Sequence, residues 1–148
     1  MSEEKLIVVN AEGLVAGRLA SIVAKKLLNG ENVVIINAEK AIITGKPQRI
    51  VNMYMKKISE WRTHFNPEKR GPKIPRRPDR VLKRMVRGML PHKKPRGRMA
   101  YKRLKVYIGV PDNVNVKEAI SIKEAMRKNE NVPFITLGEL YVRLGGKL

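Results

Sequence analysis

Several common features are missing from this chain, and each absence excludes a class of protein. None of the 148 residues is cysteine, which excludes disulfides, zinc ribbons and thiol chemistry. Aromatic residues make up only 5%, and no aromatic strand of the RNA-stacking type is present, so base-stacking recognition of single strands is not indicated. The longest apolar runs, such as residues 33–36, are far too short to cross a bilayer. The N-terminus has acids where a signal peptide needs positive charge, so we expect a soluble intracellular protein without a membrane partner.

Acidic side chains are scarce in one continuous stretch of the chain. Residues 46–105, which we call the basic segment, contain 21 Lys or Arg but only three acids, Glu60, Glu68 and Asp79. The basic segment therefore has a net charge of +18 out of +19 for the whole chain, and the other 88 residues are nearly neutral. An ordinary solvated surface mixes charges of both signs. The separation of charge predicts a large polyanion as partner.

The first third of the chain is typical of a βαβ unit. Residues 6–9 and 33–36 are short β-branched runs that predict buried strands. Between them, residues 15–27 have apolar side chains at the spacing of one helical face, so the two strands should be parallel. Residues 42–43 predict a third short extended piece, and residues 104–108 predict a strand that returns to the core.

The basic segment predicts alternating helical and irregular pieces. A helix is expected from Pro47 to Trp61, followed by an irregular stretch at 66–78 with four prolines and five bases in 13 residues. Asp79 is expected to cap a short helix with an apolar stripe from Val81 to Met89, and residues 91–99 are expected to be irregular again. We expect the large apolar residues of these helices to pack in the core, namely Trp61, Met53, Met85 and Met89.

The C-terminal part has the sequence signals of two short helices. Ser121 to Glu124 and Thr136 to Glu139 both match the capping box, which predicts helices near 122–129 and 137–144. No internal repeat or low-complexity linker divides the chain. We therefore expect a single domain over 1–148: a compact α/β body with a basic extension on one side.

Motifs for catalysis or nucleotide binding are weak. Gly13 and Gly17 follow the first strand but do not have the spacing of a dinucleotide fingerprint, and Pro47 stands where a P-loop needs Ser or Thr. His64 and His92 are the only histidines, and a histidine in a basic segment is more often a packing or hydrogen-bonding residue than a base. We expect no catalytic residue, metal, cofactor or small-molecule substrate. Two alternatives remain open: a nucleotide-dependent enzyme that binds nucleotide near residues 13–18, and a general DNA-binding protein.

Residues 87–107, RGMLPHKKPRGRMAYKRLKVY, resemble the signature of the large-subunit ribosomal protein 13 family. Residues 10–13, 17–21 and 34–40, followed by Thr44-Gly-Lys46, are similar to that family in order and spacing, and residues 91–98 and 135–148 resemble its archaeal/eukaryotic-type branch. The resemblance implies a three-layer α/β/α fold with a four-stranded, mainly parallel sheet. It also implies a structural, non-catalytic role in assembly of the large ribosomal subunit in the cytoplasm, with ribosomal RNA and neighbouring large-subunit proteins as partners. Transferred to this sequence, the implied RNA-binding residues are Lys46, Arg62, Arg70, Lys73, Arg76, Arg77, Arg80, Lys83, Arg84, Arg87, His92, Lys93, Lys94, Arg96, Arg98, Lys102 and Arg103.

Overall fold

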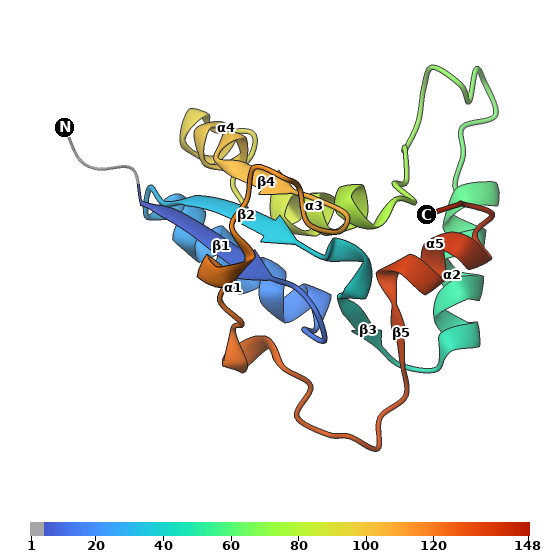
Figure 1. Ribbon diagram of the computed structural model, residues 1–148. Helices are drawn as coiled ribbons and strands as arrows, with labels where there is room; N and C mark the ends of the chain where they lie inside the picture. Colours follow the sequence, from blue (N-terminus) through green and yellow to red (C-terminus); the bar gives the residue numbers. More distant parts are fainter. Residues whose placement is uncertain (1–4) are drawn as a thin grey trace.

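The structure is a computed structural model that describes residues 5–148 (Figure 1). The acidic N-terminus, from which we predicted the lack of a signal peptide, lies largely outside the described residues. The helices are α1 (Ala16–Leu28), α2 (Pro47–Ser59), α3 (Pro78–Gly88), α4 (Pro95–Lys102) and α5 (Leu137–Arg143). The strands are β1 (Leu6–Asn10), β2 (Asn32–Ile36), β3 (Ile42–Thr44), β4 (Leu104–Val106) and β5 (Phe134–Thr136). Within residues 5–148, no helix is both long and apolar enough to span a membrane.

The main sheet has three parallel strands in the order β1-β2-β4, with Leu6 opposite Asn32 and Val33 opposite Leu104. The predicted βαβ unit and parallel sheet are thus confirmed. The predicted four-stranded sheet is corrected, because β3 pairs with β5 in a separate antiparallel sheet of two strands. Within the described part of the chain, only one residue pairs with the outer edge of β1: Ile120 donates to the Val8 carbonyl and accepts from the Asn10 amide, both at 2.9 Å.

Among the described residues, α-helices cover only one face of the main sheet. The largest core cluster joins Val9 and Val33 of the strands to Leu19 of α1 and Leu82 of α3. The opposite face, with Val8, Val34 and Ile36, is packed instead by Tyr107, Val114 and Ala119 from the segment after β4, which contains one 3-10 turn, Val116–Glu118, but no α-helix. The expectation of a second helical layer is therefore wrong for this face. Four consecutive residues of β2 are buried, which is typical of a strand enclosed on both faces. This pattern does not reveal whether a helix or a loop covers each face.

A second, smaller core holds α2 in place. Ile50 and Val51 of α2 pack against Ile135, Leu140 and Leu144, which come from β5 and the region of α5. The predicted helix 137–144 is confirmed, and Thr136 caps it by accepting a hydrogen bond from the Glu139 amide at 3.1 Å. The C-terminal residues thus fix the helix that leads into the most basic part of the chain.

The helix predicted at 122–129 is wrong. Only a short turn, Lys123–Ala125, forms there, and no side chain caps it. The carbonyl of Ala125 accepts a hydrogen bond from the Val15 amide at 2.8 Å, and Ala125 is fully buried. This segment therefore uses its backbone to cover the start of α1, whereas in a continuous helix over 122–129 the Ala125 carbonyl would accept the Asn129 amide.

Three details of the basic segment also differ from the prediction. Residues 91–99 are not irregular throughout, because α4 begins at Pro95. Asp79 is not the N-cap residue of α3: Arg77 occupies that position without a side-chain capping hydrogen bond, and Asp79 lies in the first turn. Of the four large apolar residues expected in the core, Met85 packs against it. The other three, Met53, Trp61 and Met89, are 45–53% exposed to solvent.

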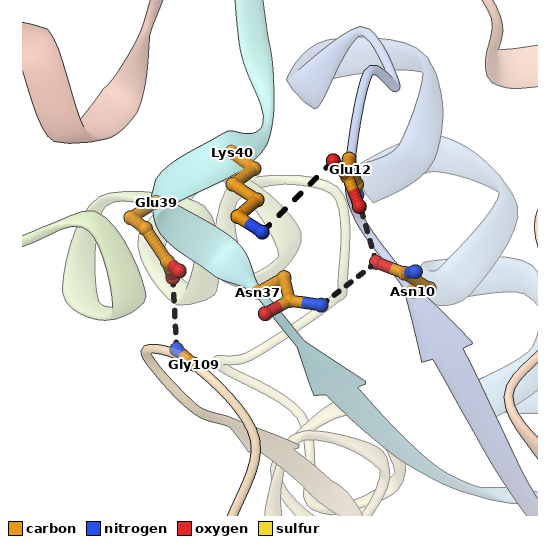
Figure 2. A network of polar contacts seen from close by, with 6 residues as sticks. All are labelled: Asn10, Glu12, Asn37, Glu39, Lys40 and Gly109. Atoms are coloured by element: carbon orange, nitrogen blue, oxygen red, sulfur yellow. Dashed lines mark hydrogen bonds and ion pairs between the residues drawn. The ribbon is translucent and has the colours of Figure 1, made fainter. Parts of the chain in front are cut away.

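A polar network joins the C-terminal ends of β1 and β2 (Figure 2). Asn37 follows β2 in the left-handed conformation, with φ at 56°, and is buried. Its side-chain amide donates to Asn10 Oδ1 at 3.2 Å, and the same oxygen accepts the Glu12 amide at 3.1 Å. Glu39 accepts the Gly109 amide at 2.9 Å, so the loop after β4 is tied to the same place.

Replacing Asn37 with alanine is expected to lower the free energy of unfolding by about 2 kcal/mol. Alanine lacks the amide that reaches Asn10, and it adopts a positive φ only with strain of about 1 kcal/mol. Asn37→Gly removes the same hydrogen bond without the strain and should lose about half as much. Urea unfolding of the three proteins measures the difference; equal stability of the two variants would contradict a conformational role for Asn37.

Candidate nucleic-acid interface

Every Lys and Arg of the basic segment has its side chain at least partly open to solvent. The most open part is the basic arm, residues 60–77, which projects from the body between α2 and α3 (Figure 1). All residues from 59 to 73 are exposed, and the predicted irregular stretch at 66–78 is confirmed up to Arg77, since α3 begins at Pro78. The arm therefore displays charge with little packing of its own.

Hydrogen bonds within the basic arm give it a defined course. The amides of Lys69 and Arg70 donate to the carbonyl of Asn66 at 3.2 and 3.0 Å, which closes a turn at the tip. Thr63 Oγ1 bonds the carbonyls of Phe65 and Arg70, at 3.1 and 3.4 Å, across the two sides of that turn. The arm is thus a folded loop whose cations have specific neighbours.

Three cavities lie where the basic arm returns to α2, α3 and α4. Their volumes are about 410, 210 and 330 Å³, and all three are lined by Lys73 and Ile74, so they adjoin. We call them together the arm groove. Its lining includes a single acid, Glu68, against eight cations: Lys57, Arg62, Arg70, Lys73, Arg76, Arg80, Lys83 and Arg84. A concave surface with this lining concentrates positive potential.

Helix α3 supplies one wall of the arm groove. Its apolar face, with Val81, Leu82 and Val86, is buried against the core, so the remaining positions present arginine and lysine to solvent. Asp79 forms an ion pair with Arg77 at 3.4 Å and accepts the Arg80 amide at 2.9 Å. The one acid of this helix therefore lies at its N-terminal end, where the helix dipole favours negative charge, and it is not among the residues that line the groove.

Two tyrosine rings, those of Tyr54 and Tyr101, line cavities of the groove. Tyr54 of α2 lines the smallest cavity, and burial raises the pKa of its hydroxyl above the ordinary value. The phenol therefore stays neutral at physiological pH and adds no negative charge to the groove. Lys83 lies 5.2 Å from the ring centroid of Tyr101, which restrains this lysine near the third cavity.

Helix α4 presents a further set of cations, Arg96, Arg98 and Lys102, all exposed. The loop before it, with Lys93 and Lys94, crosses so close to the helix that a side chain at Gly97 would meet the Pro91 carbonyl oxygen at 2.0 Å. Glycine at this position therefore allows the loop and the helix to pack as one basic unit.

The structure does not bring all 17 predicted residues together. Lys46 lies at the start of α2, in a cavity of about 590 Å³ with Arg49, while the arm leaves the other end of this helix about 20 Å away. Arg103 is half-buried and donates to the Leu27 carbonyl at 2.9 Å, so it holds the end of α1. The other 15 belong to the arm, α3, α4 and the loop before α4.

Lys57 was missed by the sequence prediction, although it lines two of the three cavities. It lies on α2 one turn before Trp61 and one turn after Tyr54, at 5.7 and 5.3 Å from their ring centroids. A lysine at helical spacing between two aromatic residues is the signal that could have identified it.

The nucleotide site considered near residues 13–18 is occupied by the chain itself. The Gly13 amide donates to the Lys40 carbonyl at 3.2 Å, and the Val15 amide donates to the Ala125 carbonyl. Arg18 donates to the Met126 carbonyl at 3.3 Å. Phosphate binding by a glycine-rich turn needs such amides free, so the geometry disfavours this alternative. Among the described residues, no group of three or more His, Cys, Asp or Glu could hold a metal ion.

The fold and the groove together define a class: an α/β protein whose body displays a one-sided cationic surface. The model of the family described as ribosomal protein L13 matches residues 4–113. The chain belongs to this family, whose members are structural, non-enzymatic proteins.

Curated relatives match nearly the whole chain. The large ribosomal subunit protein uL13 of Pyrobaculum islandicum is 49% identical over 147 residues, which cover 95% of this chain and 80% of the relative. The proteins of the same name from Methanocaldococcus jannaschii and Methanococcus maripaludis are 49% and 46% identical over 142 residues, 96% of this chain and 99% of each relative. The predicted resemblance to the archaeal type is confirmed.

Proposed function

We propose that this protein is a structural constituent of the large ribosomal subunit, that it binds ribosomal RNA through the basic segment and that it supports subunit assembly. The observation that carries the proposal is the arm groove, lined by eight cations and one acid, in a chain of the L13 family. Its relatives are named as proteins of the large subunit. On this proposal the whole chain works as a single domain, in the cytoplasm, with rRNA and neighbouring large-subunit proteins as partners.

The proposed RNA-binding residues are the predicted ones that line the groove or extend it along α3, α4 and the intervening loop, with Lys57 added. Arginine suits irregular RNA because its planar group binds phosphate through two donors and also stacks on bases. Arg103 is proposed to act through the fold, because its side chain is committed to Leu27. Lys46, at the far end of α2, is proposed to make a separate phosphate contact.

Binding to large-subunit rRNA is expected to depend steeply on salt. Each phosphate that a cation neutralises releases a counterion and changes the slope of log affinity against log salt by roughly −0.7 to −0.9. If the eight cations of the groove each meet one phosphate, the slope should lie between about −5.6 and −7.2. Filter binding of the full chain over a salt series measures this.

A nearly salt-independent affinity would contradict the proposal. Equal affinity for duplex DNA of the same charge, at the same salt, would favour the general DNA-binding alternative instead. Sedimentation from a cell lysate separates the remaining cases: the protein should stay with the large subunit at moderate and high salt, and release into the soluble fraction would count against a structural role.

A further inference from the structure

Two aromatic rings in the basic arm are left open to solvent. Trp61 is 53% exposed and Phe65 is 74% exposed, in the stretch from 59 to 73 where every residue is exposed. One exposed apolar side chain needs no explanation, but two large rings four residues apart on a projecting cationic loop indicate a contact surface.

Each of these rings is paired with a cation of the arm groove. Lys57 Nζ lies 5.7 Å from the Trp61 centroid, and the Arg70 guanidinium lies 5.9 Å from that of Phe65. Lys57 and Arg70 both line the 410 Å³ cavity, whose lining contains five cations and one acid. The two rings are therefore linked to one cavity lined mainly by cations, and both remain largely open although a cation lies near each of them.

We propose that the basic arm binds unpaired RNA, with a backbone phosphate in the 410 Å³ cavity and bases stacked on Trp61 and Phe65. The inference rests on the proposed RNA binding and specifies its substrate class. It also replaces the expectation from composition that base stacking plays no part. The cations favour a polyanion, and an unpaired strand is the polyanion that offers open base faces.

The alternatives fit less of the geometry. A duplex presents phosphates to the cavity but keeps its bases stacked inside, so Trp61 and Phe65 would gain no partner. An acidic protein surface could also bind the cations, but unlike a nucleic acid it does not carry one aromatic base for each negative charge. The volume of about 410 Å³ lies within the range of cavities that enclose small ligands, large enough for the sugar and phosphate of one nucleotide.

Trp61 is the only tryptophan of the chain, so its fluorescence reports on this site alone. The full chain is titrated with three probes of matched charge: a short oligouridylate, an RNA hairpin duplex and inorganic polyphosphate. We expect the oligouridylate to quench Trp61 emission, the duplex to quench weakly, and polyphosphate to bind without quenching. Equal quenching by oligouridylate and polyphosphate would overturn the proposal, because the signal would then follow charge and not bases.

Variants test the energetic role. Trp61→Ala should weaken binding of oligouridylate by about tenfold and binding of the duplex by less than about twofold, while Trp61→Phe should retain most of the affinity. Val116→Ala is the matched control, since Val116 is also 53% exposed but lies outside the basic segment. Unchanged oligouridylate affinity in Trp61→Ala would refute base stacking.

The experiments distinguish failure of RNA binding as a whole from failure of base stacking alone. If large-subunit rRNA and both RNA probes all fail to bind the wild-type chain, RNA binding itself is wrong. If rRNA binds with the steep salt dependence but Trp61→Ala has no effect on any probe, RNA binding stands and only the stacking proposal fails. Circular dichroism of each variant verifies that the fold is unchanged.

Discussion

Replacing Arg76, Arg77 and Arg80 together with glutamine is expected to weaken binding of large-subunit rRNA by about two orders of magnitude. Arg76 lines the largest cavity of the arm groove and Arg80 lines the third, while Arg77 connects the arm to α3. At about 1 kcal/mol for each solvent-exposed phosphate contact, three lost contacts amount to roughly 100-fold in affinity. The salt slope should also become shallower by about 2 to 3.

The same triple variant should fold normally. All three side chains are exposed, and within residues 5–148 the only bond lost is the ion pair between Arg77 and Asp79. A surface ion pair of this kind contributes at most about 1 kcal/mol. Thermal unfolding and rRNA binding are measured on the same preparation.

A charge-matched control separates site from net charge. Lys117, Lys123 and Lys128 are three exposed cations outside the basic segment, and their replacement with glutamine changes the total charge equally. This control should keep nearly full rRNA affinity. The account would be contradicted if both triple variants lost affinity equally, or if the arginine variant unfolded.

Gly97→Ala is expected to have the largest effect on stability of any single substitution considered for this chain. The new Cβ would lie 2.0 Å from the Pro91 carbonyl oxygen and 2.9 Å from the His92 nitrogen, both backbone atoms. Side chains can rotate away from such a clash, but here the loop must separate from α4. We expect a loss of about 3 kcal/mol or more in the free energy of unfolding and a melting temperature lower by roughly 10 °C.

Gly17→Ala provides the matched comparison. Gly17 also lies in a helix, α1, but a Cβ there would meet nothing within 4 Å. Alanine is the better helix former, so this variant should be unchanged or more stable by up to about 1 kcal/mol. Equal loss of stability in both variants would contradict the close packing of α4 against its loop.

Local patterns in the sequence were enough to predict the first half of the body. The apolar runs of β1 and β2 and the helical spacing of α1 depend on neighbours near in sequence, and the strands they predict pair as expected. The irregular stretch around Pro72 and Pro75 followed from proline chemistry and lies in a loop. The family was predicted from the motif around residues 87–107, and the comparisons confirm it.

Elements that depend on distant partners could not be predicted in this way. Strand β5 is only three residues long and exists because it pairs with β3, about 90 residues earlier. Helix α4 was missed because its cations and Pro95 suggested a loop; the proline is tolerated at the first helical position, and the helix is stabilised by the buried Gly97 and Ala100. The missing fourth strand also reflects tertiary contacts, since only Ile120 reaches the edge of β1.

The candidate interface was predicted in its location but not in its shape. Charge separation indicated the basic segment, and most of the predicted cations do belong to the arm, α3 and α4. The convergence of seven of them on the arm groove, the structural use of Arg103 and the exposure of Trp61 required the three-dimensional arrangement. An apolar residue near the end of a helix is by default a core residue, and only the projecting course of the arm shows otherwise.

The central claim is that this protein contacts RNA through the arm groove. Ultraviolet crosslinking of the full chain to large-subunit rRNA, followed by mass spectrometry of the crosslinked peptides, tests it most directly. The account predicts crosslinks concentrated between Lys57 and Lys102, with Trp61 and Phe65 among the modified residues. Crosslinks confined to the nearly neutral parts of the chain, such as the face formed by residues 107–120, would contradict it.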